Sequence, residues 1–321
     1  MSLRYAAAPL EGITTFIFRN AHHQLFGGAD RYFLPFFSPA AEHILTNREL
    51  RDLDPSNNTA PNLVPQVMTR RAEDFLWAAE QVRAMGYQEI NLNLGCPSGT
   101  VAAKGKGSGF LGRPEELDRF LDEVFSRVKM PVSVKTRLGI REPEEFYQIL
   151  EIFNRYPISD LTIHPRVQKE FYKGAVHRDL FAWALSESRN PLCYNGDLVT
   201  VEDCIALEVE FPEVESVMIG RGLAADPALL RKLRGGPPAT RTELKRFVQT
   251  LYEGYCTAYG QAGPAAQRMK ELWFYLIHLF QGGEKQAKAM RRLKQPREYE
   301  QLEASIFQDL ELLEAAGRPL L

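Results

Sequence analysis

The chain has 321 residues, a formal net charge of −2 at neutral pH, 45% hydrophobic residues and 25% charged residues. This balance is ordinary for a soluble globular protein, and the length is ample for one large domain with a buried core plus a smaller one. The small net charge excludes nucleic-acid binding through overall charge, so any such surface must be a local patch.

Cysteine usage and hydropathy set further limits. The four cysteines include no C-x-x-C pair, which argues against a zinc or disulfide framework and suits a reducing cytosol. The first twelve residues lack the apolar core of a signal peptide. The longest apolar run, Leu272 to Phe280, contains His278 and is too short to span a bilayer. We therefore expect a cytoplasmic protein with no membrane segment and no bound metal.

Strand-like and helical segments alternate through the first 235 residues. The strand-like runs are Tyr5–Leu10, Arg31–Phe36, Leu63–Met68, Glu89–Asn93, Val132–Thr136, Asp160–His164, Leu192–Asn195 and Ser216–Ile219. The helical patterns are Thr15–Leu25, Ala72–Ala84, Glu115–Arg127, Glu144–Arg155, Leu180–Ser188, Val201–Glu210 and Pro227–Leu233. Eight such units predict an α/β protein with a TIM (β/α)8 barrel. A doubly wound sheet is the alternative, but it less readily places polar residues at nearly every strand end.

Those polar strand ends are the second signal. The residues concerned are Glu11-Gly12, Gln66, Asn93, Cys96, Lys135, Arg137, His164, Asn195-Gly196-Asp197 and Gly220-Arg221-Gly222. Taken singly, each is explained by a rim charge, a polar cap or a turn. In a barrel they converge on the C-terminal face, where active sites lie, and the last two groups occupy the usual phosphate site.

Cys96 follows a strand in which Ile90, Leu92 and Leu94 alternate with two asparagines. A buried hydrophobe, a nucleophile and a general acid are all open roles for a lone cysteine. Its place in a loop favours a functional thiol. An ordinary thiol pKa of about 8.5 lets the group carry its proton at neutral pH and still release it. Gly107 to Gly112 fit G-x-G-x-x-G, but about a dozen residues separate them from the strand, which excludes a dinucleotide fingerprint.

A linker at Arg234–Thr240 separates the barrel, residues 1–235, from a predicted small all-α helical bundle domain, residues 241–321. The predicted helices are Glu243–Tyr259, Ala265–Gln281, Glu284–Leu293 and Tyr299–Ala315, with breaks at Gly263-Pro264, Gly282-Gly283 and Pro296. Ala265 to Arg297 carry eight Lys or Arg residues against two acids. This run predicts either a solvated helix face or a phosphate-binding surface.

Several motifs together resemble one family. They are Ala8-Pro-Leu-Glu-Gly12, Asn91-Leu-Asn-Leu-Gly-Cys-Pro97, Lys104-Gly-Lys-Gly-Ser-Gly109, Val134-Lys-Thr-Arg137, Thr162-Ile-His164, Asn195-Gly-Asp197 and Ile219-Gly-Arg-Gly222. In this order they resemble the tRNA-dihydrouridine synthases. The resemblance spans residues 8 to 230 and implies an FMN-containing barrel, NADPH as reductant, and a helical domain that helps hold tRNA.

The resemblance also implies roles for single residues. Cys96 matches the acid that protonates carbon 5 of a flipped-out uracil while reduced FMN delivers a hydride to carbon 6. The matches to cofactor-binding positions are Pro9, Leu10, Glu11, Gln66, Lys135, His164, Asn195, Gly196, Asp197, Gly220 and Arg221. The expected substrate contacts are Asn93, Lys104, Arg137 and Arg166. Many family members have Gly-Arg-Thr where this chain has Pro165-Arg166-Val167.

Other functions remain open at this point. The main alternative is an FMN-dependent oxidoreductase of a free pyrimidine or another small molecule, of the dihydroorotate-dehydrogenase kind. A flavin-free aldolase would use Lys135 as a Schiff base. A non-catalytic RNA-binding protein would bind tRNA without oxidising NADPH. We expect a monomer whose partners are tRNA and NADPH.

Overall fold

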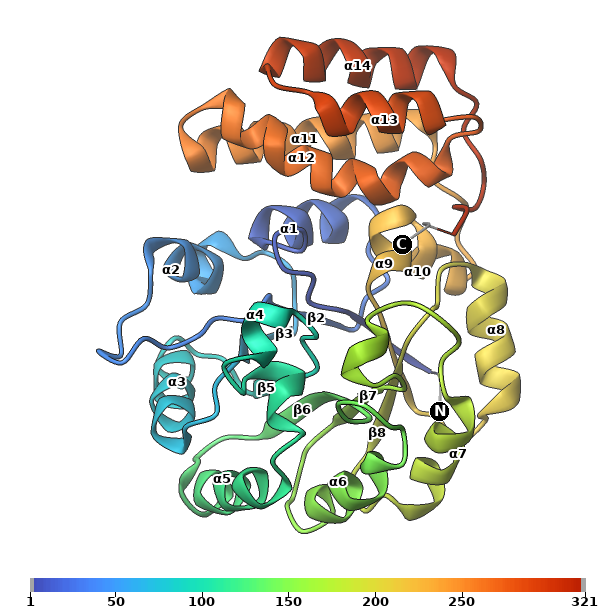
Figure 1. Ribbon diagram of the computed structural model, residues 1–321. Helices are drawn as coiled ribbons and strands as arrows, with labels where there is room; N and C mark the ends of the chain where they lie inside the picture. Colours follow the sequence, from blue (N-terminus) through green and yellow to red (C-terminus); the bar gives the residue numbers. More distant parts are fainter. Residues whose placement is uncertain (1–2, 319–321) are drawn as a thin grey trace.

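The strands form a parallel barrel that is enclosed by helices and carries further helices against one side (Figure 1). The computed structural model describes residues 3–318. The strands of this part are β1 (Arg4–Ala7), β2 (Arg31–Phe33), β3 (Leu63–Val64), β4 (Gln66–Val67), β5 (Ile90–Leu94), β6 (Val132–Arg137), β7 (Leu161–His164), β8 (Leu192–Asn195) and β9 (Ser216–Ile219).

The helices follow the strands along the chain. In the barrel they are α1 (Phe16–Leu25), α2 (Asn47–Leu53), α3 (Ala72–Ala84), α4 (Gly99–Ala102), α5 (Pro114–Arg127), α6 (Glu145–Phe153), α7 (Arg178–Glu187), α8 (Val201–Glu210), α9 (Arg221–Ala225) and α10 (Leu229–Leu233). The C-terminal helices are α11 (Arg241–Tyr259), α12 (Ala262–Leu276), α13 (Glu284–Arg292) and α14 (Pro296–Asp309).

A proline divides the predicted strand Leu63–Met68 and closes the barrel. β3 pairs with β2, whereas β4 pairs with β5, so the two short strands occupy one position of an eight-membered ring. Pro65 lies between them and has no N–H to donate, but its carbonyl accepts a bond from the Asn91 amide at 2.8 Å. The predicted TIM barrel is therefore confirmed, with one strand split in two.

Along the central strands, alternate side chains point outward to the surrounding helices or inward to the barrel interior. Ile90 and Leu92 of β5 are fully buried in the core that also contains Phe75 and Leu117 of the surrounding helices. Successive strand residues point to opposite faces, so Asn91 and Asn93 point into the barrel. The polar residues of β5 are thereby placed on its inner face.

Several predicted boundaries were wrong. The predicted helix Pro227–Leu233 is the shorter α10, and an unpredicted short helix, α9, starts before it at Arg221. Gly263-Pro264, predicted as a break, lies in the first turn of α12, where a proline costs no helical hydrogen bond. α14 starts at Pro296 and ends at Asp309, short of the predicted Ala315. α2 was not predicted, and it begins with a capping box formed by Thr46 and Glu49.

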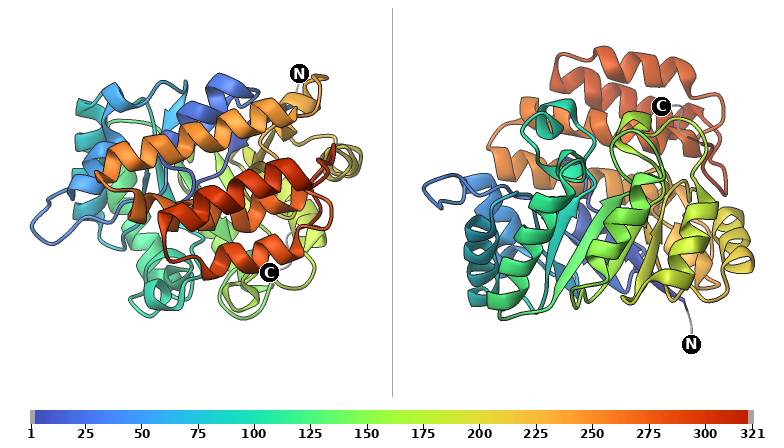
Figure 2. Two further views of the ribbon diagram at one scale, coloured as in Figure 1. Left: turned by 90° about the horizontal axis from the view of Figure 1, so that it is seen from above. Right: turned by 60° about the horizontal axis from the view of Figure 1, so that its bottom comes forward.

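The C-terminal helices share a hydrophobic core with the barrel. Phe247 of α11 packs edge-on against Phe18 of α1 and against Phe26 just after that helix, with ring centroids 5.6 and 5.4 Å apart. Figure 2 shows the C-terminal helices stacked over this part of the barrel. Within residues 3–318, no helix is both long and apolar enough to cross a membrane. The division between residues 235 and 241 stays a prediction.

Candidate active site

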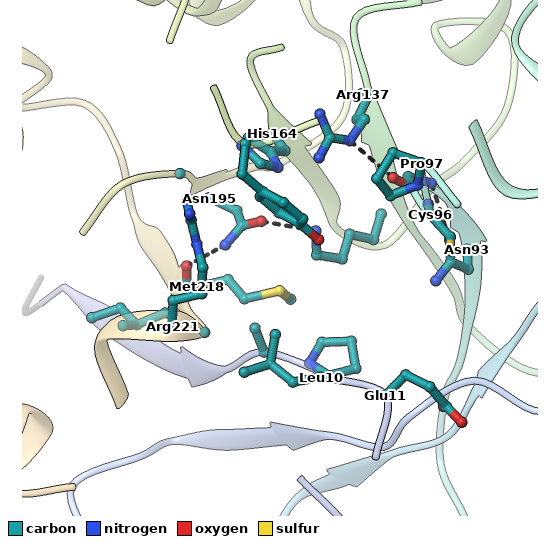
Figure 3. A pocket seen from close by; sticks show the side chains of 18 of the residues that line it. Leu10, Glu11, Asn93, Cys96, Pro97, Arg137, His164, Asn195, Met218 and Arg221 are labelled. Carbon is teal, nitrogen blue, oxygen red and sulfur yellow. Dashed lines mark hydrogen bonds between the residues drawn. The ribbon is translucent and has the colours of Figure 1, made fainter. Parts of the chain in front are cut away.

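A pocket at the C-terminal ends of the barrel strands collects most of the predicted site residues (Figure 3). It encloses about 920 Å³, part of it open to solvent. The predicted residues that line it are Pro9, Leu10, Glu11, Gln66, Asn93, Cys96, Lys135, Arg137, His164, Asn195, Gly196, Asp197, Gly220 and Arg221. Parallel strands end at one edge of a barrel, so these distant segments meet there.

Cys96 lies on a turn that is fixed from two directions. The Asn93 side-chain oxygen accepts hydrogen bonds from the backbone N–H groups of Gly95 at 3.0 Å and Cys96 at 2.9 Å. The backbone and hydroxyl of Ser108 donate to the Cys96 carbonyl at 3.1 and 2.8 Å. Gly107 has φ +55°, and a Cβ there would lie 2.9 Å from the Cys96 carbonyl. The glycine-rich loop therefore packs closely against the turn that carries Cys96.

The environment keeps the Cys96 thiol protonated. Burial raises its pKa above the ordinary value, whereas a backbone N–H of Ser98 and the charges of Arg137 and Lys135 oppose the rise. Because the net shift is upward, the group carries its proton at neutral pH. Figure 3 shows Cys96 and Asn93 on one side of the pocket, with Met218 and Arg221 on the other.

Lys135 faces the pocket from β6 and is held by one amide. Its ammonium donates to the Asn195 side-chain oxygen at 2.8 Å, and the Asn195 nitrogen donates to the Met218 carbonyl at 2.7 Å. Burial, with a smaller contribution from the Arg137 charge, lowers the pKa of Lys135 to about 7. A negative charge placed beside it would favour the protonated form.

His164 contributes a neutral ring. Burial and the charges of Arg137, Lys135 and Arg166 lower its pKa well below the ordinary value. Arg166 lies 3.2 Å from His164 Nε2, and an arginine only donates, so Nε2 is the acceptor. The remaining proton is therefore on Nδ1.

Two arginines clamp Asp197. Its carboxylate accepts from Arg166 at 2.8 and 2.5 Å and from Arg221 at 2.6 Å. Burial alone raises the pKa of Asp197, but the two arginines outweigh burial and lower it. Asp197 therefore stays ionised and holds Arg221 at the edge of the pocket.

Two predicted substrate residues lie outside the pocket lining. Arg166 is fully buried, and its guanidinium also donates to the Gly174 carbonyl, so the structure places it behind Asp197. This position lets Arg166 orient Asp197, and its predicted role as a substrate contact stays a prediction. Lys104 is exposed on the turn after α4.

Tyr172 is the main pocket residue that the sequence did not single out. The Arg221 and Arg137 guanidinium carbons lie 4.6 and 5.2 Å from its ring centroid, and the His164 ring is 6.0 Å away. It sits in the loop after β7, beyond the expected motif. The aromatic pair Phe171-Tyr172 in an otherwise polar loop was the available signal. Ala8, Pro35, Phe36, Leu198, Val199, Met218 and Ile219 belong to the unpredicted lining as well.

Positive charge predominates around the pocket. Its lining combines Lys135, Arg137 and Arg221 with the carboxylates of Glu11 and Asp197. The Asp197 charge is already compensated from both sides. Within the described residues, no group of three or more His, Cys, Asp or Glu side chains is arranged to hold a metal ion.

Comparisons with known proteins agree with this architecture. Residues 6–312 match the model of the Dihydrouridine synthase (Dus) family. A probable tRNA-dihydrouridine synthase of Staphylococcus aureus (strain COL) is 31% identical over 240 residues, covering 71% of this chain and 70% of that protein. A probable tRNA-dihydrouridine synthase 1 of Synechocystis sp. is 29% identical over 275 residues, covering 85% and 73%.

The fold has solved counterparts as well. Morphinone reductase superimposes with a TM-score of 0.51 at 14% identity, over 75% of this chain and 88% of that one, which supports the barrel fold. The family match spans nearly the whole chain and includes every strand end that lines the pocket. The chain belongs to the dihydrouridine synthase family.

Proposed function

We propose that the protein is a tRNA-dihydrouridine synthase that reduces the C5–C6 double bond of a D-loop uridine, with FMN as cofactor and NADPH as reductant. The observation that carries the proposal is the placement of Cys96, Asn93, Lys135 and Gln66 around one pocket. Family membership supports the reaction type.

The residues present fit a flavin mononucleotide. Leu10, Met218 and Ile219 supply apolar surface for a flat ring. A Cβ on Gly220 would lie 3.2 Å from the Ala8 Cβ, so the glycine leaves this part of the pocket free of a side chain. Arg221 and the neighbouring backbone suit a phosphate, and Lys135 suits a negatively charged ring edge.

The chemistry at the uracil ring divides between cofactor and protein. Bound reduced FMN supplies the hydride for carbon 6. Cys96 gives its thiol proton to carbon 5 and is reprotonated from solvent, so that one hydride and one proton enter the ring. The upward shift in the Cys96 pKa supports this role because it keeps the proton available at neutral pH. Asn93 holds the turn that presents the thiol.

The basic helix α13 favours tRNA as substrate over a free pyrimidine. Lys285, Lys288 and Arg292 of α13 are all exposed. A line of exposed cations is what a phosphate backbone needs, whereas a small ring has no use for it. Lys104 stays a proposed substrate contact.

Nucleoside mapping tests the proposal. Transfer RNA from a strain lacking this gene is digested and analysed by mass spectrometry, before and after restoring wild type, Cys96→Ala or Cys256→Ala. Cys256 lies on α11 outside the pocket, so its variant is the matched control. We expect wild type and Cys256→Ala to restore dihydrouridine. Cys96→Ala should keep its yellow FMN and lose about 10²- to 10⁴-fold in rate, the usual contribution of a positioned acid.

Two results would contradict this function. Full activity of Cys96→Ala removes the proton donor. Equal reduction of free uridine and tRNA by purified protein favours the small-molecule oxidoreductase.

A further inference from the structure

Side-chain amides from two barrel strands form a continuous hydrogen-bonded chain beneath Cys96. Asn93 donates to the Gln66 oxygen at 2.7 Å, and the Gln66 nitrogen donates to the Asn91 oxygen at 2.7 Å. The Asn91 nitrogen then donates to the Ser133 hydroxyl at 2.9 Å. Gln66, Asn91 and Ser133 are cross-strand partners in register, and all three are fully buried.

The direction of this chain is set at its Cys96 end. The backbone N–H groups of Gly95 and Cys96 both point at the Asn93 side chain, so that end must be the oxygen. The Asn93 nitrogen therefore faces Gln66, so the Gln66 side-chain oxygen must be the acceptor. By the same reasoning, the Asn91 oxygen faces the Gln66 nitrogen, and the Asn91 nitrogen faces Ser133. The Ser133 hydroxyl ends the chain because it is able to accept a hydrogen bond.

This direction decides what the pocket floor presents. The side-chain oxygens of Asn93 and Gln66 are both used inside the chain. Each amide nitrogen has donated one of its two hydrogens. Asn93 and Gln66 both border the pocket, but only Asn93 has exposed surface, at 7%, so the hydrogen left for a ligand is on the Asn93 nitrogen. A ring edge that carries acceptor atoms is matched there, and one that carries donors is not.

We infer that Asn91 and Ser133 are positioning residues that act through Gln66 and Asn93 to fix the Cys96 turn and to make the floor of the pocket a donor surface. Neither residue lines the pocket. Buried amides without partners are costly, so removal of one link favours rearrangement of the next. The inference about the turn is independent of the reaction, and its bearing on proton transfer rests on the proposed function.

The test uses the full chain and measures backbone hydrogen exchange at single residues, together with FMN affinity. In Asn91→Leu, we expect the Gly95 and Cys96 amides to exchange at least about fivefold faster, the effect of losing one net hydrogen bond. FMN affinity should fall by about tenfold. Asn91→Asp should restore much of both, because a protonated carboxyl accepts from Gln66 and donates to Ser133.

The controls separate positioning from general destabilisation. Ser216→Ala removes a buried barrel hydroxyl that lies outside the chain and the pocket. It should leave the Gly95 and Cys96 exchange rates unchanged. Amides of β8, across the barrel, should exchange at wild-type rates in Asn91→Leu. If Asn91→Leu does not fold, Ser133→Ala is measured instead. We then expect the Gly95 and Cys96 amides to exchange faster by at least about half the factor expected for Asn91→Leu.

Two outcomes would overturn the inference. One is unchanged exchange at Gly95 and Cys96 in both Asn91→Leu and Ser133→Ala. The other is an increase of equal size throughout the barrel. Failure here is distinct from failure of the proposed function, because exchange is measured without tRNA and activity is judged by Cys96→Ala.

Discussion

At the scale of single residues, the cationic side chains in and behind the pocket differ in whether a carboxylate or a neutral oxygen accepts their hydrogen bonds. Arg166 and Arg221 share the carboxylate of Asp197. Lys135 donates to the neutral side chain of Asn195, and Arg137 to the carbonyls of Gly95 and Val167. Positive charge without an acidic partner therefore lies on the Cys96 side of the pocket, on Arg137 and, because its pKa is about 7, partly on Lys135. An anionic ring edge would gain most there.

The titration of Lys135 gives a first prediction. Its pKa of about 7 lies below the ordinary value of 10.5, so between these pH values the unfolded chain binds more protons. The contribution of this group to stability should therefore rise as pH increases from 7 towards 10.5, by at most about 1.4 kcal/mol per pH unit. Urea unfolding of the flavin-free protein against pH measures the slope. Lys135→Met should flatten the slope, and an unchanged slope in that variant would contradict the assignment.

Arg166 gives a second prediction. In Arg166→Met the Asp197 carboxylate keeps only Arg221, and breaking a buried pair typically costs about 3–5 kcal/mol. The Asp197 pKa is lowered in the native protein, so this stabilisation is complete above the unfolded pKa near about 4 and is lost as pH falls through the lower folded value. The difference in unfolding free energy between the two proteins should thus narrow below about pH 4.

The matched control is Arg178→Met, which removes an arginine whose partner is the surface carboxylate of Glu210. We expect it to change stability by about 1 kcal/mol or less, as for exposed ion pairs. An equal loss in both variants would show that Asp197 does not depend on Arg166.

These residues also show what sequence can and cannot predict at this scale. Cys96, Lys135 and His164 were predicted because each stands at or just past the end of a strand, and the barrel brings such positions together. The pairing of Arg166 with Asp197 was not predicted, because the two residues are 31 positions apart in the chain and follow different strands. Tyr172 was missed because its position depends on how the long loop after β7 folds back over the pocket, and hydrophobic periodicity carries no information about loop conformation.

At the scale of elements, the loop that follows β5 works as a support for Cys96. The 3₁₀ turn Gly107–Phe110 packs against the cysteine turn, and both polar groups of Ser108 hold the Cys96 carbonyl. The sequence located this glycine-rich loop after Cys96, but only the folded loop shows that it packs against the cysteine turn. Pro65 is a similar case, because a run of apolar residues does not reveal that a strand changes partners halfway.

Two glycines of this loop supply a matched test. Gly105 and Gly107 have φ +65° and +55°, so alanine strains both, typically by about 1 kcal/mol. At Gly107 a Cβ would lie 3.0 Å from the Cys96 Cβ, whereas at Gly105 the nearest atoms are 3.5 Å away on flexible arginines. Gly107→Ala should therefore lower tRNA reduction by at least about tenfold more than Gly105→Ala, measured at a temperature where both variants are fully folded. Equal rates would separate the loop from catalysis.

At the scale of the whole molecule, the C-terminal helices pack directly on the barrel. A Cβ on Gly254 of α11 would lie 2.7 Å from an Ile17 side-chain carbon, so the glycine lets α11 and α1 pack closely. The linker composition predicted separate domains, yet Ala224 and Ala225 of α9 belong to the same core as the C-terminal helices. Sequence indicated the helices but could not show this shared core, because the contacts join segments far apart in the chain.

The exposed cations of α13 provide the last prediction, which tests how the whole molecule holds its substrate. In α13 only Met290 is buried, so the helix presents nearly all its side chains to solvent. Changing Lys285, Lys288 and Arg292 to Glu together should weaken tRNA binding. It should also reduce the slope of log affinity against log salt by roughly 0.7–0.9 for each phosphate that the helix no longer neutralises.

The matched control changes Arg83, Arg119 and Lys129 to Glu, exposed cations on or beside α3 and α5 that give the same net charge. Filter binding across a salt series compares the two triple variants. Because the net charge is matched, an equal loss of affinity in both would mean that long-range attraction, and not contact with α13, governs binding. A loss confined to the α13 variant would place tRNA phosphates on that helix.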